Sequence, residues 1–482
     1  MDSRFVLRQG WGMRRTSILF ALVAFASACA APIGGEDVAV HEGGTADVSA
    51  DSPIAMDVPT VDTPELDVAM PEDTVTEDAV TSDTGAGADS GIDLAALARR
   101  RAACDFAAGD HVAETIGLTR AERTAIPLRH LIVYVGENRS FDHYVGRLPA
   151  MGRSDVDGIP TGYTNPRDSG GTASPSHAGT TCISPDVPHG WNPMHTAWNA
   201  GQMDQFFNVA DSSTASGQRA LTYYDDRDIP FYTYLYNTFA ISDRFFSSVL
   251  GPTWPNRDYL YAATSDGVKN TFERQITVRS IFDAMTAAHV TWKVYAAGSF
   301  REGCINWTSS HAGVSNTTGL FDDINNDTLP QVAFIDGPDD HPPANIQVAE
   351  AFARRVYVAL RGSPAWATSA LVMSYDEAGG FFDHVPPPTA CRPDGTLANS
   401  DFNRLGIRVP LVVISPWARP HYASHVRAET ASITRLIEAL HDLPALTNRD
   451  ANVNALLDMF DFSAPHLMSP PAAPAAGTGG CP

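Results

Sequence analysis

Short apolar runs recur along the chain, and segments with helical spacing separate them. The runs are long enough for buried strands and cover residues 131–135, 291–295, 331–335, 370–375 and 409–414. Helical patterns lie between or after them, at residues 280–288, 345–361 and 432–440. Because strands that alternate with helices form a mostly parallel sheet with helices on both faces, the pattern predicts an α/β fold.

The first apolar run opens directly into polar residues. It ends at Gly136, and Glu-Asn-Arg-Ser-Phe-Asp-His-Tyr follows at residues 137–144. In α/β proteins the chemistry lies at the carboxyl edge of the parallel sheet, so this segment is a candidate part of an active site. An ordinary polar loop after a strand is the alternative.

A second polar segment, residues 251–257, has the sequence Gly-Pro-Thr-Trp-Pro-Asn-Arg. Gly251-Pro252 favours a turn, and Pro255 suits the first turn of a helix. Thr253 is therefore expected at a helix amino terminus, where backbone N–H groups favour a bound phosphate and an ionised hydroxyl. Without a phosphate, a threonine at this place is simply a helix cap.

A third segment, residues 372–388, carries the adjacent carboxylates Asp376 and Glu377 at a predicted strand end. Two ionised carboxylates side by side repel each other, and a cation between them relieves the repulsion. An exposed Asp-Glu pair without any function is common. Two loop histidines, His189 and His341, complete the polar candidates, although a lone loop histidine is usually structural.

Together these segments resemble the bacterial phosphoesterase family, which includes non-haemolytic phospholipases C and an acid phosphatase. The resemblance rests on the 137–144 string, on the 251–257 string, on Asp-Glu-Ala-Gly-Gly-Phe-Phe-Asp-His-Val-Pro-Pro-Pro at 376–388, and on the histidine segments. It covers roughly residues 128 to 442. Membership implies an alkaline-phosphatase-like, three-layer α/β/α sandwich with a mostly parallel central sheet.

The resemblance also implies roles for individual residues. Thr253 would be the nucleophile, and His189 and His341 would contact the substrate phosphate. One divalent metal ion would be held by a set of four residues, Glu137, Asn138, Asp376 and Glu377. Oxygen-rich ligands favour a hard ion such as Ca, Mg or Mn, while superfamily precedent allows Zn.

Three functions are compatible with these residues. The first is a phospholipase C that cleaves phospholipid diesters through a phospho-threonine intermediate. The second is an acid-phosphatase-like phosphomonoesterase acting on small phosphate esters, which Thr253 disfavours because the phosphatase branch uses Ser. The third is a catalytically inactive surface protein, which the intact residue set disfavours. Aromatic residues near Thr253 could form an apolar rim for a lipid or could be core, namely Phe245, Phe246, Trp254 and Tyr259.

The amino-terminal part of the chain is strongly acidic. Residues 36–93 hold sixteen Asp and Glu and no Lys or Arg, so they supply −16 of the formal charge of −23. No basic patch argues for nucleic acid as a partner. Residues 30–103 are expected to be a disordered acidic tether, residues 104–463 the catalytic domain of a monomer, and residues 464–482 a loose Pro/Ala/Gly tail.

Residues 1–29 resemble a signal peptide, with an apolar run before Ala-Ser-Ala-Cys29. This ending is similar to a lipoprotein signal, which predicts an exported protein anchored in a membrane by lipid on Cys29, periplasmic or at the cell surface. Simple cleavage and secretion is the alternative. An exported chain favours disulfides among the other cysteines, at 104, 182, 304, 391 and 481, in a pairing that the sequence leaves open.

Overall fold

The computed structural model describes residues 92–297, 314–394 and 400–481, and these residues fold around one central sheet. Its described strands lie side by side in the order β13 (Tyr422–Ser424), β6 (Ala240–Ser242), β12 (Leu411–Ile414), β11 (Ser369–Tyr375), β1 (His130–Gly136), β10 (Val332–Asp336), β8 (Trp292–Ala296) and β9 (Val314–Asn316).

Most neighbouring strands of this sheet run parallel. β1 lies between β11 and β10 and pairs in parallel with both, whereas β12 runs antiparallel to β11 and to β6. The five predicted strands all form, and the prediction of a mostly parallel sheet is confirmed. The short strands β6, β9 and β13 were not predicted, because three residues are too few to show a pattern.

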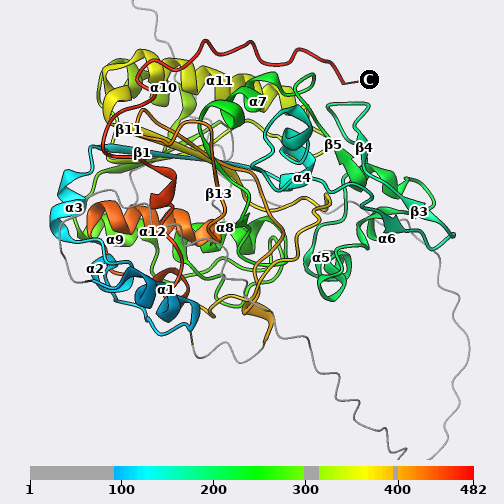
Figure 1. Ribbon diagram of the computed structural model, residues 1–482, viewed down its shortest axis with the longest axis horizontal. Helices are drawn as coiled ribbons and strands as arrows, with labels where there is room; N and C mark the ends of the chain where they lie inside the picture. Colours follow the sequence, from blue (N-terminus) through cyan, green and yellow to red (C-terminus); the bar gives the residue numbers. More distant parts are fainter. Residues whose placement is uncertain (1–91, 298–313, 395–399, 482) are drawn as a thin grey trace, which may run out of the picture. The chain divides into compact units, whose positions relative to one another are not determined.

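Helices cover both faces of the sheet, so the predicted three-layer α/β/α arrangement is confirmed (Figure 1). One layer contains α7 (Pro230–Thr238), α10 (Thr317–Asn325) and α11 (Ile346–Gly362). The other contains α8 (Thr253–Ala262), α9 (Ile281–Ala287) and α12 (Thr430–His441). The three predicted helices correspond to α9, α11 and α12.

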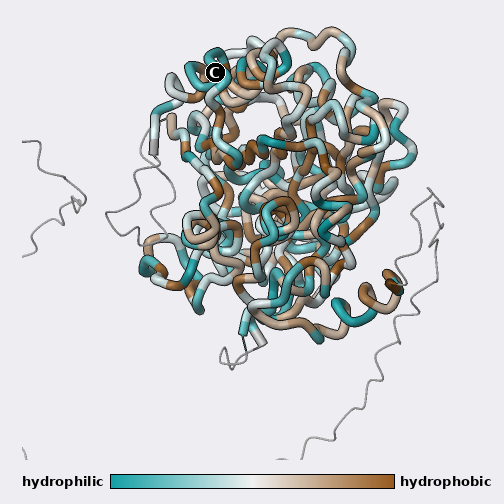
Figure 2. The backbone as a smooth tube through the Cα atoms, turned by 90° about the vertical axis from the view of Figure 1, so that its left-hand side faces the viewer, coloured by the Kyte–Doolittle hydropathy of each residue, from teal (hydrophilic) through white to brown (hydrophobic). Residues whose placement is uncertain are grey.

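The hydrophobic core follows from the burial of these elements. Every residue of β1 from Leu131 to Val135 is buried, as expected for a parallel strand with a helix layer on each side. On α11 the buried apolar residues repeat every three or four positions, at Ile346, Ala349, Ala353, Val356 and Leu360. In Figure 2 hydrophobic stretches accordingly run through the interior of the domain.

Shorter elements complete the domain. They are α1 (Leu94–Ala102), α2 (Val112–Thr115), α3 (Arg120–Ala125), α4 (Phe141–Tyr144), α5 (Trp191–Trp198), α6 (Phe206–Ala210) and α13 (Asn448–Ala451), and the paired strands β2 (Asn165–Pro166) with β3 (Thr172–Ala173), β4 (Ser176–His177) with β5 (Thr222–Tyr223), and β7 (Phe245–Phe246) with β14 (Ala428–Glu429).

The folded part begins before the expected boundary at residue 104. Helix α1 has Asp93 as its amino-terminal cap, and the Arg101 guanidinium donates hydrogen bonds to the Thr115 carbonyl and to Asn454. These contacts tie residues of the expected tether to the domain. Residues 1–91, which include the expected signal peptide, Cys29 and the acidic segment, lie outside the described residues.

The carboxy-terminal residues differ from the expected loose tail. Residues 464–481 contain no helix or strand, but their backbone is bound to α11 and its neighbours. Gly477 N–H donates to Glu350, and the Pro474 carbonyl accepts a hydrogen bond from Arg354. A chain rich in Pro still has free carbonyl groups, and polar side chains on α11 bind them.

Two disulfides fix the ends of the described domain. Cys104 is bonded to Cys391, and Cys182 is bonded to Cys481. The expectation of disulfides among the last five cysteines is therefore met by four of them. Cys29 and Cys304 lie outside the described residues.

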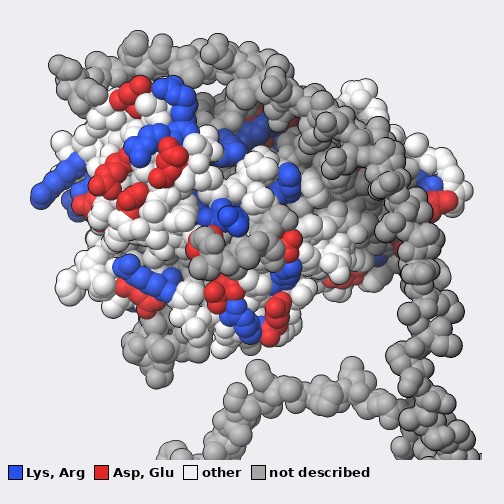
Figure 3. All heavy atoms as spheres, turned by 90° about the horizontal axis from the view of Figure 1, so that it is seen from below, with Lys and Arg blue, Asp and Glu red and all other residues white. Residues whose placement is uncertain are grey.

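The surface carries charges of both signs. Figure 3 shows Lys and Arg mixed with Asp and Glu over the face that it presents. Among the residues described, none of the helices has both the length and the apolar character needed to cross a bilayer.

Candidate active site

The carboxyl ends of β1 and β11 bring two predicted residue pairs together. The strands are adjacent and parallel, with Gly136 opposite Tyr375, so the residues that follow them meet at one edge of the sheet. Asn138 N–H donates to Asp376 Oδ1 over 3.1 Å. Asn138 has a φ of 66°, a left-handed conformation that asparagine tolerates better than most residues.

Thr253 faces this edge from the other side of the site. It is the first residue of α8, as the sequence predicts, and its hydroxyl donates to Glu137 Oε1 over 3.3 Å. Asn256 holds the preceding turn, because its Nδ2 donates to the Gly251 carbonyl and its Oδ1 accepts from Val249 N–H. The hydroxyl is thus fixed beside a carboxylate and at the positive end of a helix.

Arg257 is a site residue whose role the sequence did not reveal. It follows Thr253 by one helical turn and is buried, and its Nε donates to Asp376 Oδ2 over 3.0 Å. Its Nη1 lies 3.9 Å from Asp336 Oδ1, which places Asp336, the last residue of β10, behind the site. The spacing of four residues from Thr253 on one helix face was the available signal.

The two predicted histidines also reach the site. His189 Nδ1 donates to the Val187 carbonyl, so its Nε2 accepts from Asn138 Nδ2 over 3.3 Å. This Nε2 also lies 3.8 Å from Glu377 Oε1. The ring of His341 is 5.4 Å from that of His189, centroid to centroid. The structure therefore brings all seven predicted residues into one cluster.

Asp186 connects the two histidines and was not singled out from the sequence. Its Oδ2 lies 3.5 Å from His189 Nδ1 and 3.7 Å from His341 Nε2. These three side chains form a group in which a ligand atom from each lies within 4.8 Å of the others. The expectation of a single metal ion rests on the absence of a second Asp-His group in the sequence. Because the structure brings these three residues together, the number of metal ions stays a prediction.

The residues of the cluster fit a hard divalent cation. Asn138 Oδ1 and Glu377 Oε1 are buried oxygens without a hydrogen-bond donor among the described residues, and both belong to the predicted ligand set. Burial raises the pKa of Asp376, although Arg257 opposes the effect. Burial, and then the charge of Asp376, raises the pKa of Glu377. A bound cation would satisfy the two oxygens and stabilise the ionised carboxylates.

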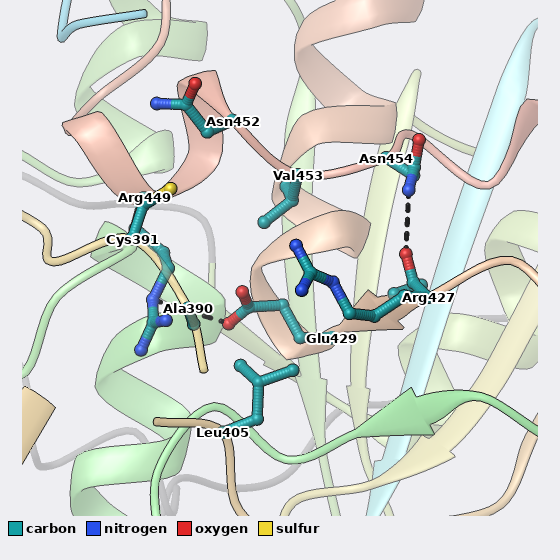
Figure 4. A pocket seen from close by; sticks show the side chains of 10 residues that line it. Ala390, Cys391, Leu405, Arg427, Glu429, Arg449, Asn452, Val453 and Asn454 are labelled. Atoms are coloured by element: carbon teal, nitrogen blue, oxygen red, sulfur yellow. Dashed lines mark hydrogen bonds and ion pairs between the residues drawn. The ribbon is translucent and has the colours of Figure 1, made fainter. Parts of the chain in front are cut away.

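The buried ion pair of Arg449 and Glu429, drawn in Figure 4, contacts the turn before Thr253. Ser248 donates its hydroxyl hydrogen to Glu429, and Arg449 donates to the Ser248 carbonyl. Arg449 Nε lies 3.6 Å from Glu429 Oε2, beside a small pocket of about 20 Å³. This pocket is lined by Cys391, Glu429, Arg449 and their neighbours, and none of the seven predicted residues lines it.

Other polar residues near the site have structural partners. His195 lies on α5 and donates to the Trp191 carbonyl of its own helix. Asp383 accepts from Arg408 Nε over 2.9 Å, and His384 pairs with Asp142. These contacts shape the loop that follows Glu377.

Comparisons with known proteins find relatives over most of the described domain. The model of the Phosphoesterase family matches residues 128–444, which include all seven predicted residues. Phospholipase C B of Mycobacterium tuberculosis is 30% identical over 423 residues, which cover 71% of this chain and 80% of that protein. Non-specific phospholipase C6 of Arabidopsis thaliana is 27% identical over 398 residues, covering 71% and 73%. Non-hemolytic phospholipase C of Burkholderia pseudomallei is 28% identical over 435 residues, covering 73% and 61%.

Proposed function

Because the chain belongs to the Phosphoesterase family and is a hydrolase of phosphate esters, we propose that it acts as a phospholipase C that uses Thr253 as its nucleophile. The observation that carries this proposal is the hydrogen bond from Thr253 to Glu137 at the edge of the sheet. The names of the relatives support a phospholipid diester as the substrate.

In the proposed mechanism the side chains act on one phosphorus atom. Glu137 accepts the hydrogen bond of the Thr253 hydroxyl and is placed to take its proton. Thr253 Oγ1 then attacks phosphorus and the diacylglycerol oxygen leaves, which gives a phospho-threonine that water hydrolyses to a phosphorylated head group. In their protonated, imidazolium forms His189 and His341 would neutralise phosphoryl oxygens, and one would give its proton to the leaving oxygen.

A divalent ion held by Glu137, Asn138, Asp376 and Glu377 would supply Lewis-acid chemistry, lowering the pKa of the hydroxyl and neutralising phosphate charge. The buried, donor-free oxygens of Asn138 and Glu377 support this part of the proposal. Arg257 holds the carboxylate of Asp376 in place for binding the ion.

An acid-phosphatase-like phosphomonoesterase is the second candidate. Both activities need the same nucleophile and cation, so the cluster alone does not separate them. We favour the diesterase because a threonine stands at position 253 and because the relatives are named phospholipases.

Paired substrates test the proposal. Wild-type protein should hydrolyse p-nitrophenyl phosphorylcholine, a diester, and lose this activity when a chelator removes the metal. Thr253→Ala should lower the rate at least about a thousandfold while circular dichroism and metal content stay unchanged. Hydrolysis of p-nitrophenyl phosphate with none of the diester would replace the phospholipase by the phosphatase.

We also propose that the protein is exported and held at a membrane by lipid on Cys29. The signal-like residues 1–29 and the acidic segment support this, and two disulfides suit an oxidising compartment. Mass spectrometry of the mature amino terminus tests it, because a start beyond Cys29 would exclude the anchor.

A further inference from the structure

An aromatic pair with one exposed ring lies beside the nucleophile. Of the four nearby aromatic residues, Phe245, Phe246 and Tyr259 are buried, whereas Trp254 is only partly buried. Phe272 packs edge-on against Trp254, with ring centroids 4.8 Å apart, and is itself 80% exposed. Among the exposed large apolar side chains of the described residues, Phe272 has the highest exposure.

The turn that carries Phe272 is braced by hydrogen bonds. Glu273 Oε2 accepts from the backbone N–H groups of Lys269 and Asn270, each over 3.0 Å. Arg274 pairs with Asp266 across the base of the same turn. Phe272 has a φ of 64°, a conformation that bulky residues rarely adopt. The turn therefore fixes the backbone of Phe272, whose ring touches Trp254 and is otherwise exposed.

The turn lies at the end of α8 that carries Thr253. Trp254, the second residue of the helix, donates its backbone N–H to Thr271 Oγ1 over 3.5 Å. Backbone N–H groups of a first helical turn point out of the amino terminus, which is also where a phosphate would bind. Thr271, and hence Phe272, therefore borders the place of the substrate phosphate.

We propose that Phe272, backed by Trp254, inserts into the surface of a zwitterionic phospholipid membrane and so presents the nucleophile to its substrate. An aromatic ring suits the boundary between head groups and acyl chains. Residues 265–278 carry two basic and two acidic side chains and are neutral overall, which fits zwitterionic rather than anionic lipid. The inference rests on the proposed function, because only a lipid substrate requires such contact.

The experiment compares Phe272→Ser with Val358→Ser. Val358 is a 46% exposed apolar residue on α11, in the opposite helix layer. All full-length proteins also carry Cys29→Ala, so that no acyl chain anchors them. Rates are measured on phosphatidylcholine vesicles and on monomeric p-nitrophenyl phosphorylcholine. Phe272→Ser should lower the vesicle-to-monomer rate ratio about tenfold, and Val358→Ser should leave it unchanged.

Vesicle flotation with the additional change Thr253→Ala gives a readout without catalysis. The Phe272 protein should float with vesicles, and the Phe272→Ser protein should not. If the proteins with and without Phe272→Ser float equally, Phe272 is not a membrane contact. The same holds if Phe272→Ser lowers the vesicle rate and the monomer rate by the same factor. If neither substrate is hydrolysed but flotation depends on Phe272, the proposed phospholipase activity fails while the membrane contact stands.

Discussion

At the scale of single residues, Asp376 connects the parts of the site. Its Oδ1 accepts from the N–H groups of Asn138 and Glu377, and its Oδ2 accepts from Arg257. The carboxylate thereby joins the ends of β1 and β11 to helix α8.

Asp376→Asn should remove both metal and activity. The amide carries no charge to balance a cation. Its NH2 group would also face one of the N–H groups from which the carboxylate accepts a hydrogen bond. We expect bound metal below one tenth of the stoichiometric amount by elemental analysis and at least about a hundredfold lower rate. Asp322→Asn, at an exposed aspartate of α10 outside the predicted ligand set, is the matched control. Full metal content in Asp376→Asn would exclude Asp376 as a ligand.

The site residues that could be predicted from the sequence are those that stand next to each other in the chain. Glu137 and Asn138, or Asp376 and Glu377, are adjacent in sequence and follow apolar runs, so their place at a sheet edge was predictable. Arg257 was missed because its partner Asp376 lies far away in the chain. Asp186 lies only three residues before His189, but it stands outside the strings that carry the resemblance. The Arg257 ion pair spans 119 residues, a contact that no local pattern reveals.

At the scale of elements, Glu350 joins α11, α7 and the carboxy-terminal segment. It is buried, and its Oε1 accepts from Phe231 N–H at the start of α7 while Oε2 accepts from Gly477 N–H. Tyr232 N–H also donates to Oε1. Burial raises the pKa of Glu350 to about 7, although the hydrogen bonds from these three N–H groups oppose the rise.

The stability of the domain should therefore depend on the charge of Glu350. A folded pKa above the unfolded one means that the contribution is complete below about pH 4.5 and is lost as pH rises towards 7, by at most about 3 kcal/mol. In Glu350→Gln the melting temperature should fall less steeply across this range. Glu114→Gln, at an exposed glutamate, should leave the slope as in wild type. Equal slopes in all three proteins would contradict the assignment.

Elements were predictable where they are long. Strand β1 and helix α11 have patterns of seven and seventeen residues, and both were found near their true bounds. Strand β12 was found, but its antiparallel direction shows only in its pairing with β11 and β6. Direction is a property of pairing, and pairing is not visible in one strand.

At the scale of the whole molecule, the Cys182–Cys481 disulfide ties the carboxy-terminal segment to the loop that carries His189. Asn345, four residues after His341, donates to the Gly479 carbonyl nearby. The same segment thus contacts the neighbourhoods of both histidines.

Cys481→Ser should lower the free energy of unfolding by about 3–5 kcal/mol, because the unfolded chain gains the freedom of a long loop. Differential scanning calorimetry without reductant measures the change, and chemical reduction of wild type should lower the melting temperature at least as far. Limited proteolysis should cut the variant between residues 464 and 481 first. An unchanged melting temperature would show that the hydrogen bonds alone hold the segment.

The two disulfides also constrain how the protein is made. They join residues 287 and 299 positions apart in the chain. During synthesis from the amino terminus, Cys104 and Cys182 both emerge long before Cys391 and Cys481. In the oxidising compartment that we propose for this protein, two free thiols readily form a premature bond. Correct pairing there would require reshuffling, so efficient production by export should need a disulfide isomerase in addition to an oxidase.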